Sequence, residues 1–289
     1  MEPLCLLTVH AHPDDESSKG PATVARYHAE GIRTVLVCCT GGEEGDILNP
    51  AMDTVDVRRD LPAVRRRELQ AAASLIGYDE VVELGYRDSG MPGTPANEHP
   101  GSFARAPLQE AVGRLVTVVR RVRPQVVVTY PEDQSAYPHP DHVRVHDVSV
   151  AAFSAAGDSR LFPEAGPAWA PSKLYAVGWS GARIVAMHAK FEELGLESPY
   201  DEAWLERASR PQPPYTAVVD VADYADVRHA ALLAHATQVD PTSRFWFGLP
   251  PEVSRTIHPF DEYVLLRPMA GEPGHRATEV EDDLFAGVR

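Results

Sequence analysis

Apolar residues follow two different spacings along the chain. Runs in which nearly every residue is apolar predict strands buried on both faces, and they cover 5–10, 33–40, 80–86, 125–130, 173–180, 215–221 and 262–268. Segments with apolar residues three and four apart predict helices, and they cover 20–31, 63–77, 107–124, 181–195 and 225–238. This alternation predicts an α/β fold with a mostly parallel sheet and helices on both faces.

The length of 289 residues fits one large domain or two small ones. We expect a single α/β domain over 1–268, in which 170–268 completes the binding pocket. The segment 162–172 is rich in Pro, Gly and Trp, and it is interpreted as an excursion within this domain. The polar and acidic tail over 269–289 is expected to be loose.

Composition narrows the class of partner. The formal net charge is −15 and no run is rich in Lys or Arg, which argues against nucleic acid and anionic membrane surfaces. No apolar stretch is long enough for a membrane span and no signal peptide is recognisable, so we expect a cytoplasmic protein. Small molecules remain as partners, and the oligomeric state stays open. Cys5, Cys38 and Cys39 lie in strand-like segments, which suits reduced thiols.

Polar clusters follow the ends of the predicted strands. They occupy 10–20, 40–50, 86–93 and 130–142. Because the carboxyl ends of parallel strands meet at one edge of a sheet, ligands bind in the crevice that such loops form. The chemistry is therefore expected in these four segments.

Two short motifs carry candidate metal ligands. His12 and Asp15 are three residues apart after the first strand, so both side chains can reach one point. His139, Asp141 and His142 follow another strand at the same predicted edge. Two imidazole nitrogens and a carboxylate oxygen are typical ligands of catalytic zinc, which keeps a further position for water.

Catalytic roles follow from the same clusters. Asp14, beside Asp15, is a candidate general base, and His139 is a candidate acid or a donor to an oxyanion. Taken singly, a His-Pro-Asp motif is typical of a turn whose Asp caps the next helix. Two such motifs, each closing a strand, favour a metal site.

Two other kinds of site are weaker candidates. Cys38 or Cys39 could serve as a thiol nucleophile, but their place within an apolar run favours packing inside a strand. The glycine-rich segment 40–46 lacks the spacing of known phosphate-binding loops. Glu43, Glu44 and Asp46 would also repel phosphate, which disfavours a metallophosphatase.

Several motifs together resemble the LmbE/PIG-L family of zinc-dependent N-deacetylases, which have a Rossmann-like α/β fold. The resemblance extends over nearly the whole chain up to about Arg267. It rests on "AHPDDE" (11–16), "CTGGEEGDILNP" (39–50), "RRRELQAA" (65–72), "RDSGMP" (87–92), "YPHPDH" (137–142), "GLESPY" (195–200) and "LLAHATQVDP" (232–241).

By position, the resemblance implies a ligand set and a catalytic set. His12, Asp15 and His142 become the ligands of one zinc ion per subunit, with ferrous iron as the alternative metal. Asp14 becomes the general base. Tyr137 and His139 would stabilise the oxyanion, and His139 would protonate the leaving amine.

The resemblance also implies substrate-binding residues. Arg65 and Asp88 match positions that hold a glucosaminyl-inositol group, and Gln238 closes the site. Asp141 would orient His139 or a ligand. Two further residues, Lys19 and Glu43, are also expected to bind substrate. The amidase branch of the family carries Lys at position 19, where the deacetylase branch carries a small polar residue.

The expected reaction is hydrolysis of the amide between glucosamine and N-acetylcysteine in S-conjugates of mycothiol, an actinobacterial thiol. One alternative is deacetylation of N-acetylglucosaminyl-inositol during mycothiol synthesis. Another is the same amidase chemistry on a mycothiol-tagged intermediate of a natural product. A binding protein without turnover is disfavoured because Asp14 and His139 are both present.

Overall fold

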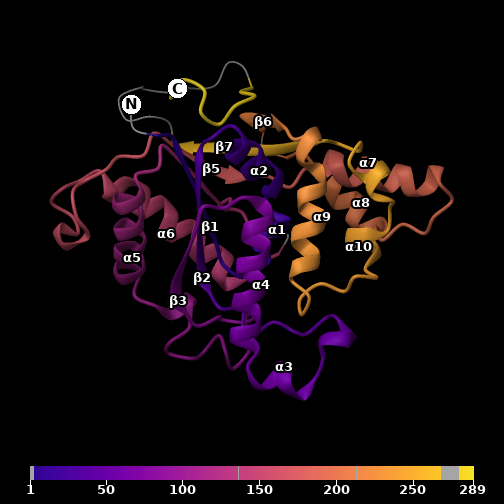
Figure 1. The fold of residues 1–289 in the computed structure, drawn as a ribbon, viewed down its shortest axis with the longest axis horizontal. Coiled ribbons are helices and arrows are strands. Elements are labelled where there is room, and N and C mark those ends of the chain that lie inside the picture. Colours follow the sequence, from indigo (N-terminus) through magenta and orange to yellow (C-terminus); the bar gives the residue numbers. More distant parts are fainter. Residues whose placement is uncertain (1–2, 136, 213, 268–279) are drawn as a thin grey trace.

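The computed structural model describes residues 3–135, 137–212, 214–267 and 280–289. Within these residues, seven strands form one sheet in the order β3-β2-β1-β4-β5-β7-β6 (Figure 1). Pairing is parallel from β3 to β5, whereas β7 runs antiparallel to both β5 and β6. The strands are β1 (Cys5–His10), β2 (Arg33–Thr40), β3 (Glu80–Tyr86), β4 (Val126–Thr129), β5 (Lys173–Val177), β6 (Ala217–Asp220) and β7 (Phe260–Arg267). The predicted mostly parallel sheet is confirmed.

The helices include all five that the spacing predicts and several more. In the described residues they are α1 (Asp15–Ser18), α2 (Pro21–Ala29), α3 (Val55–Arg59), α4 (Leu61–Ile76), α5 (Leu108–Val122), α6 (Pro140–Ala156), α7 (Gly181–Glu193), α8 (Glu202–Ala208), α9 (Ala225–Ala234), α10 (Arg244–Phe247) and α11 (Pro251–Ser254). The 17-residue helix α6 was not predicted, and it places His142 in the first turn of a helix. None of these helices is long and apolar enough to cross a membrane.

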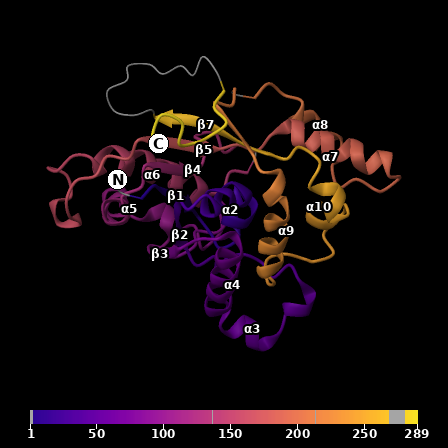
Figure 2. The ribbon, with the colours of Figure 1, turned by 45° about the horizontal axis from the view of Figure 1, so that its top comes forward.

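Alternate residues of the central strands face two different helical layers. Leu7 and Val9 of β1 pack in a core shared with α5 and α6, whereas Leu6 packs in a core shared with α2 and α9. Figure 1 and Figure 2 show α5 and α6 on one side of the sheet and α4 beside α9 on the other. Since strand side chains alternate between faces, helices on both sides bury the central strands completely.

The paired cysteines of β2 take part in this packing. Cys39 belongs to the core shared with α5 and α6, and Cys38 packs on the opposite face against α4. Both thiols are free and fully buried, and burial raises the pKa of each above its usual value. Packing inside a strand is therefore confirmed, and a thiol nucleophile is not supported at this position.

The C-terminal segment corrects one expectation. Of the tail over 269–289, which was expected to be loose, residues 280–289 are described. Leu284 and Phe285 are fully buried against α2, and Glu281 pairs with the ammonium of Lys173 at 2.7 Å. The two apolar residues and this ion pair fasten the segment to the sheet despite its acidic composition.

Candidate active site

The loops after the strands converge on one cavity of about 470 Å³. Its walls come from all four polar segments, from α4, and from α9 and the region after it. They include His12, Asp14, Asp15, Ser18, Lys19, Gly42, Glu44, Gly45, Asp46, Leu48, Arg65, Asp88, Gly90, Met91, Tyr137, His139, His142, Leu232, Gln238, Val239 and Trp246. The predicted convergence of chemistry at one sheet edge is thus seen in the structure.

One group of possible metal donors joins the two predicted motifs. The Oδ2 atom of Asp15 lies 3.3 Å from Nδ1 of His12 and 3.4 Å from Nε2 of His142. The backbone N–H of His12 donates to the same Oδ2 atom at 2.9 Å, which fixes the carboxylate. His12, Asp15 and His142 are all buried or nearly so, and their donor atoms lie within 4.8 Å of one another.

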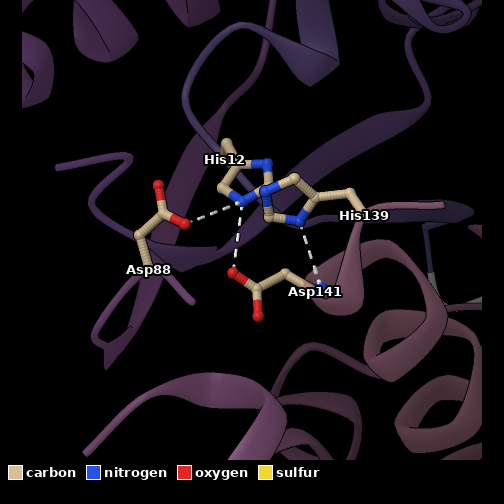
Figure 3. Close-up of side chains that lie close together, drawn as sticks. All are labelled: His12, Asp88, His139 and Asp141. Atoms are coloured by element: carbon tan, nitrogen blue, oxygen red, sulfur yellow. Dashed lines mark hydrogen bonds and ion pairs between the residues drawn. The ribbon is translucent and has the colours of Figure 1, made fainter. Parts of the chain in front are cut away.

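A second group shares His12 (Figure 3). Nε2 of His12 lies 3.2 Å from Oδ2 of Asp141 and 3.5 Å from Oδ1 of Asp88. His139 completes this group, and its ring meets that of His12 edge to face with centroids 4.5 Å apart. Asp141 therefore contacts His12 through its carboxylate, whereas it reaches His139 only through its backbone N–H.

The carboxylates around these imidazoles favour a positive charge at the site. Burial disfavours a charged His12, but the carboxylates of Asp141, Asp15 and Asp88 outweigh it and hold the pKa of His12 well above its usual value. Burial likewise disfavours ionised Asp15, yet Lys19 and His142 hold the pKa of Asp15 well below its usual range. Imidazole and carboxylate donors buried among further carboxylates fit a divalent metal ion.

Asp14 holds an unusual backbone conformation between β1 and α1. Its φ angle is 108°, in the left-handed region that non-glycine residues rarely adopt. Its N–H donates to Oε2 of Glu16 at 2.9 Å, which secures this conformation. Burial, together with the charge of Asp15, raises the pKa of Asp14 to about 6. A carboxylate that titrates so close to neutral pH is suited to proton transfer.

A buried pair beneath Asp14 supports the turn. Oε1 of Glu16 lies 2.6 Å from Nε2 of His235, and neither side chain is exposed to solvent. The hydroxyl of Ser17 donates to the same oxygen at 2.5 Å. His235 was not identified from the sequence as part of the site, although it stands in the "HATQ" motif beside Gln238. Ser89 was missed as well, and its N–H donates to Asp141 at 2.9 Å.

His139 begins helix α6 as its N-cap. Its Nδ1 atom accepts a hydrogen bond from the N–H of Asp141 at 3.2 Å (Figure 3). Burial, with the positive charge of His12, lowers the pKa of His139 to about 4. A neutral imidazole whose Nδ1 accepts carries its proton on Nε2, so that atom can donate to a ligand. The ring of Tyr137 stacks on His139 with centroids 6.1 Å apart, and this side chain is 56% exposed.

The expected substrate-binding residues divide between the cavity and its surroundings. Arg65, Asp88, Lys19 and Gln238 line the cavity, whereas Glu43 does not, because it faces a neighbouring hollow. Glu44 lines the cavity beside it, and substrate binding by Glu43 stays a prediction.

The contacts of these residues indicate what each can offer a ligand. Arg65 is fully buried and donates through Nη2 to two backbone carbonyls, while its Nε and Nη1 have no partner among the described residues. The amide of Gln238 donates to the carbonyl of Pro13 at 2.5 Å and so ties the region after α9 to the first motif. Lys19 donates to Oδ1 of Asp15 at 2.5 Å.

Comparison with known proteins gives matches over the whole chain. The family model of PIG-L, described as GlcNAc-PI de-N-acetylase, matches residues 7–153. The mycothiol S-conjugate amidase of Streptomyces coelicolor is 42% identical over 295 residues, covering 99% of this chain and 98% of that protein. The 1D-myo-inositol 2-acetamido-2-deoxy-alpha-D-glucopyranoside deacetylase of Geodermatophilus obscurus is 41% identical, covering 98% and 97%.

A solved structure agrees on the fold. The N,N'-diacetylchitobiose deacetylase of Pyrococcus horikoshii has a TM-score of 0.62 to this chain at 17% sequence identity. The match covers 92% of this chain and 84% of that one. At this low identity the likeness concerns the fold alone.

Proposed function

This chain belongs to the PIG-L family of de-N-acetylases, and we propose that it is a metal-dependent amidase acting on mycothiol S-conjugates. The bond hydrolysed is the amide between glucosamine and N-acetylcysteine. One observation carries the proposal: the buried group of His12, Asp15 and His142 lies at the cavity with the carboxylate of Asp14 beside it. The amidase from Streptomyces coelicolor, which is similar over its full length, supports the choice of substrate.

We propose that His12, Asp15 and His142 hold the metal, which is zinc or, as the alternative, ferrous iron. Such an ion supplies a Lewis acid that activates water and polarises an amide carbonyl. We prefer these three donors to the group that contains Asp88 and His139, because His139 then remains able to donate to the substrate oxygen. Asp141 and Asp88 then act on His12 from behind and fix the orientation of its ring.

The side chains around the metal divide the proton transfers. Asp14 accepts a proton from the attacking water, since burial has brought its pKa to about 6. The Nε2–H of His139 and the hydroxyl of Tyr137 donate to the oxygen that becomes negative during attack. The proton that Asp14 has taken from water then passes to the departing glucosamine nitrogen, so the step balances. His139, which is neutral because its pKa is lowered to about 4, keeps donating to the oxygen, and the expected role of His139 as the acid is not retained.

The two ends of the substrate meet different walls. The unpartnered Nε and Nη1 of Arg65 are donors for hydroxyl groups of the glucosaminyl-inositol part. Lys19 lies one turn after Asp15, where its ammonium can reach an acceptor on the cysteinyl side. Deacetylation of N-acetylglucosaminyl-inositol is the second candidate reaction, favoured by the 41% identical deacetylase.

The test compares both substrates on one preparation. The product measured is glucosaminyl-inositol, which carries a free amine. Its release is followed from a bimane S-conjugate of mycothiol and from N-acetylglucosaminyl-inositol, with Asp14→Asn as the background control. We expect kcat/KM to be at least about tenfold higher for the conjugate, because a charge-assisted hydrogen bond from Lys19 is absent with an acetyl group. A preference for N-acetylglucosaminyl-inositol would instead assign the chain to deacetylation.

A further inference from the structure

A second cavity, of about 100 Å³, lies beside the catalytic one and plays no part in the chemistry described above. We call it the aromatic cavity, because Trp179, Tyr200, Phe245 and Trp246 line it. The rings of Trp179 and Phe245 are nearly parallel, with centroids 6.5 Å apart and planes 9° apart. The ring of Trp246 meets both edge to face. Such walls favour a flat apolar ligand.

The aromatic cavity adjoins the catalytic cavity. Leu232 and Trp246 line both of them. Ser18 and Lys19 line the catalytic cavity, and Ala22, in the first turn of α2, lines the aromatic one. A group attached to the cysteinyl side of a substrate that lies near Lys19 is therefore close to the entrance of the aromatic cavity.

The aromatic cavity also has cationic side chains in its wall. Arg183 and Arg228 line it and share the single carboxylate of Asp261, at 3.3 Å and 2.9 Å. Nε of Arg228 is buried and has no partner among the described residues. Glu262 also acts on the charge of Arg183, so nearby carboxylates balance the two guanidinium groups. Either guanidinium group can still contact the electron-rich face of an aromatic ring.

We propose that the aromatic cavity is the subsite for the S-linked group of the conjugate and that it selects aromatic groups. This inference rests on the proposed amidase function and specifies its substrate class. At about 100 Å³ the aromatic cavity is smaller than the apolar cavity of about 150 Å³ that holds benzene, so it admits no more than one ring, part of which stays outside. Mycothiol conjugates of aromatic electrophiles are then better substrates than conjugates of small alkyl groups.

The experiment compares S-benzyl and S-methyl conjugates of mycothiol in three variants. Trp179→Ala removes one wall of the cavity. Because the side chain of Trp179 is already 38% exposed, the fold should tolerate this change. Ala225→Phe adds a ring to a residue that lines the cavity. Trp204→Ala is the matched control, because Trp204 packs on Tyr200 and Phe245 but does not line the cavity.

We expect the wild type to prefer the S-benzyl conjugate, through a lower KM. In Trp179→Ala and Ala225→Phe, kcat/KM for S-benzyl should fall about tenfold or more, because an aromatic contact and its apolar burial are lost. The S-methyl conjugate should keep its kcat and KM in both variants, and Trp204→Ala should keep the wild-type ratio between the two conjugates.

Two results would overturn the inference in different ways. If the wild type hydrolyses both conjugates but Trp179→Ala and Ala225→Phe leave their ratio unchanged, the aromatic cavity is only a packing feature and the amidase function stands. If the wild type hydrolyses neither conjugate while it deacetylates N-acetylglucosaminyl-inositol, the proposed function fails and the inference fails with it.

Discussion

The catalytic and aromatic cavities share two wall residues, yet they are built in opposite ways. In the catalytic cavity, hydrogen bonds hold the carboxylate of Asp15 through the N–H of His12, the carboxylate of Asp141 through Ser89, and the backbone of Asp14 through Glu16. In the aromatic cavity, the walls are rings and guanidinium groups, which offer a ligand a fitting shape and a complementary charge. Chemistry requires atoms held within a fraction of an ångström, whereas selection of an apolar group needs only a fitting surface. Changes in the first should therefore lower kcat, and changes in the second should raise KM.

The largest effect is expected from Asp14→Asn. The amide cannot accept a proton from water, so kcat should fall about 10²–10⁴-fold, while the metal stays bound because the ligands are untouched. Steady-state rates and metal content are measured on the same samples. Asp56→Asn, on the exposed side of α3, is the control and should match the wild type. A kcat for Asp14→Asn near that of the wild type would remove Asp14 from the mechanism.

Next in size is the loss of the support beneath Asp14. Glu16→Ala leaves His235 buried without its partner, so the free energy of unfolding should fall by about 3–5 kcal/mol. The N–H of Asp14 also loses its acceptor, so kcat should fall in the variant that remains folded. Denaturant unfolding and rates at low temperature measure the two effects. Unchanged stability would mean that this pair does not hold the turn.

Lys19→Ser is expected to act on substrate choice. For mycothiol conjugates kcat/KM should fall about tenfold to hundredfold, the worth of one charge-assisted hydrogen bond, while activity on N-acetylglucosaminyl-inositol stays level or rises. Because Lys19 also pairs with Asp15, metal content is measured alongside. An equal fall for both substrates would show that Lys19 supports the metal loop and does not discriminate between substrates.

The smallest effect concerns Asp261 in the aromatic cavity and depends on pH. Burial disfavours ionised Asp261, but Arg228 and Arg183 outweigh it and lower its pKa below the usual value. Its contribution to stability is therefore present above the unfolded pKa of about 4 and lost as pH falls through the lower folded pKa. Asp261→Asn should cost about 1.5–3 kcal/mol of unfolding free energy at pH 7 and less as the pH approaches 3. A cost that does not change with pH would contradict this account.

The two cavities also differ in how far the sequence predicts them. The residues proposed for the catalytic cavity could be named from the sequence because they stand in short motifs directly after apolar strands, as with His12 after β1. Helix α6 was missed because Pro140 and the polar residues around it are typical of a loop as well as of a helix start. Side-chain direction is also beyond the sequence motif: Glu44 lines the cavity and its neighbour Glu43 does not.

The aromatic cavity has no such signal in the sequence. Trp179 precedes α7, Trp246 belongs to the four-residue helix α10, and Asp261 lies in β7. These residues share no motif and no spacing, and only the packing of α7, α9 and α10 at one end of the molecule brings them together (Figure 1). The buried end of the C-terminal segment was missed for the same reason, since Leu284 and Phe285 are two apolar residues in an acidic context.

Metal content across ligand variants tests the central claim, that the buried His and Asp side chains form a metal centre, most directly. Elemental analysis is carried out on the wild type, on Asp15→Ala and His142→Ala, and on Asp88→Ala as the matched variant of the second group. The account predicts one metal per chain in the wild type and in Asp88→Ala, and none in Asp15→Ala or His142→Ala, all with native circular dichroism because the sheet supplies the core. Retention of tightly bound metal in Asp15→Ala and His142→Ala, with loss in Asp88→Ala, would place the ion in the other group and contradict it.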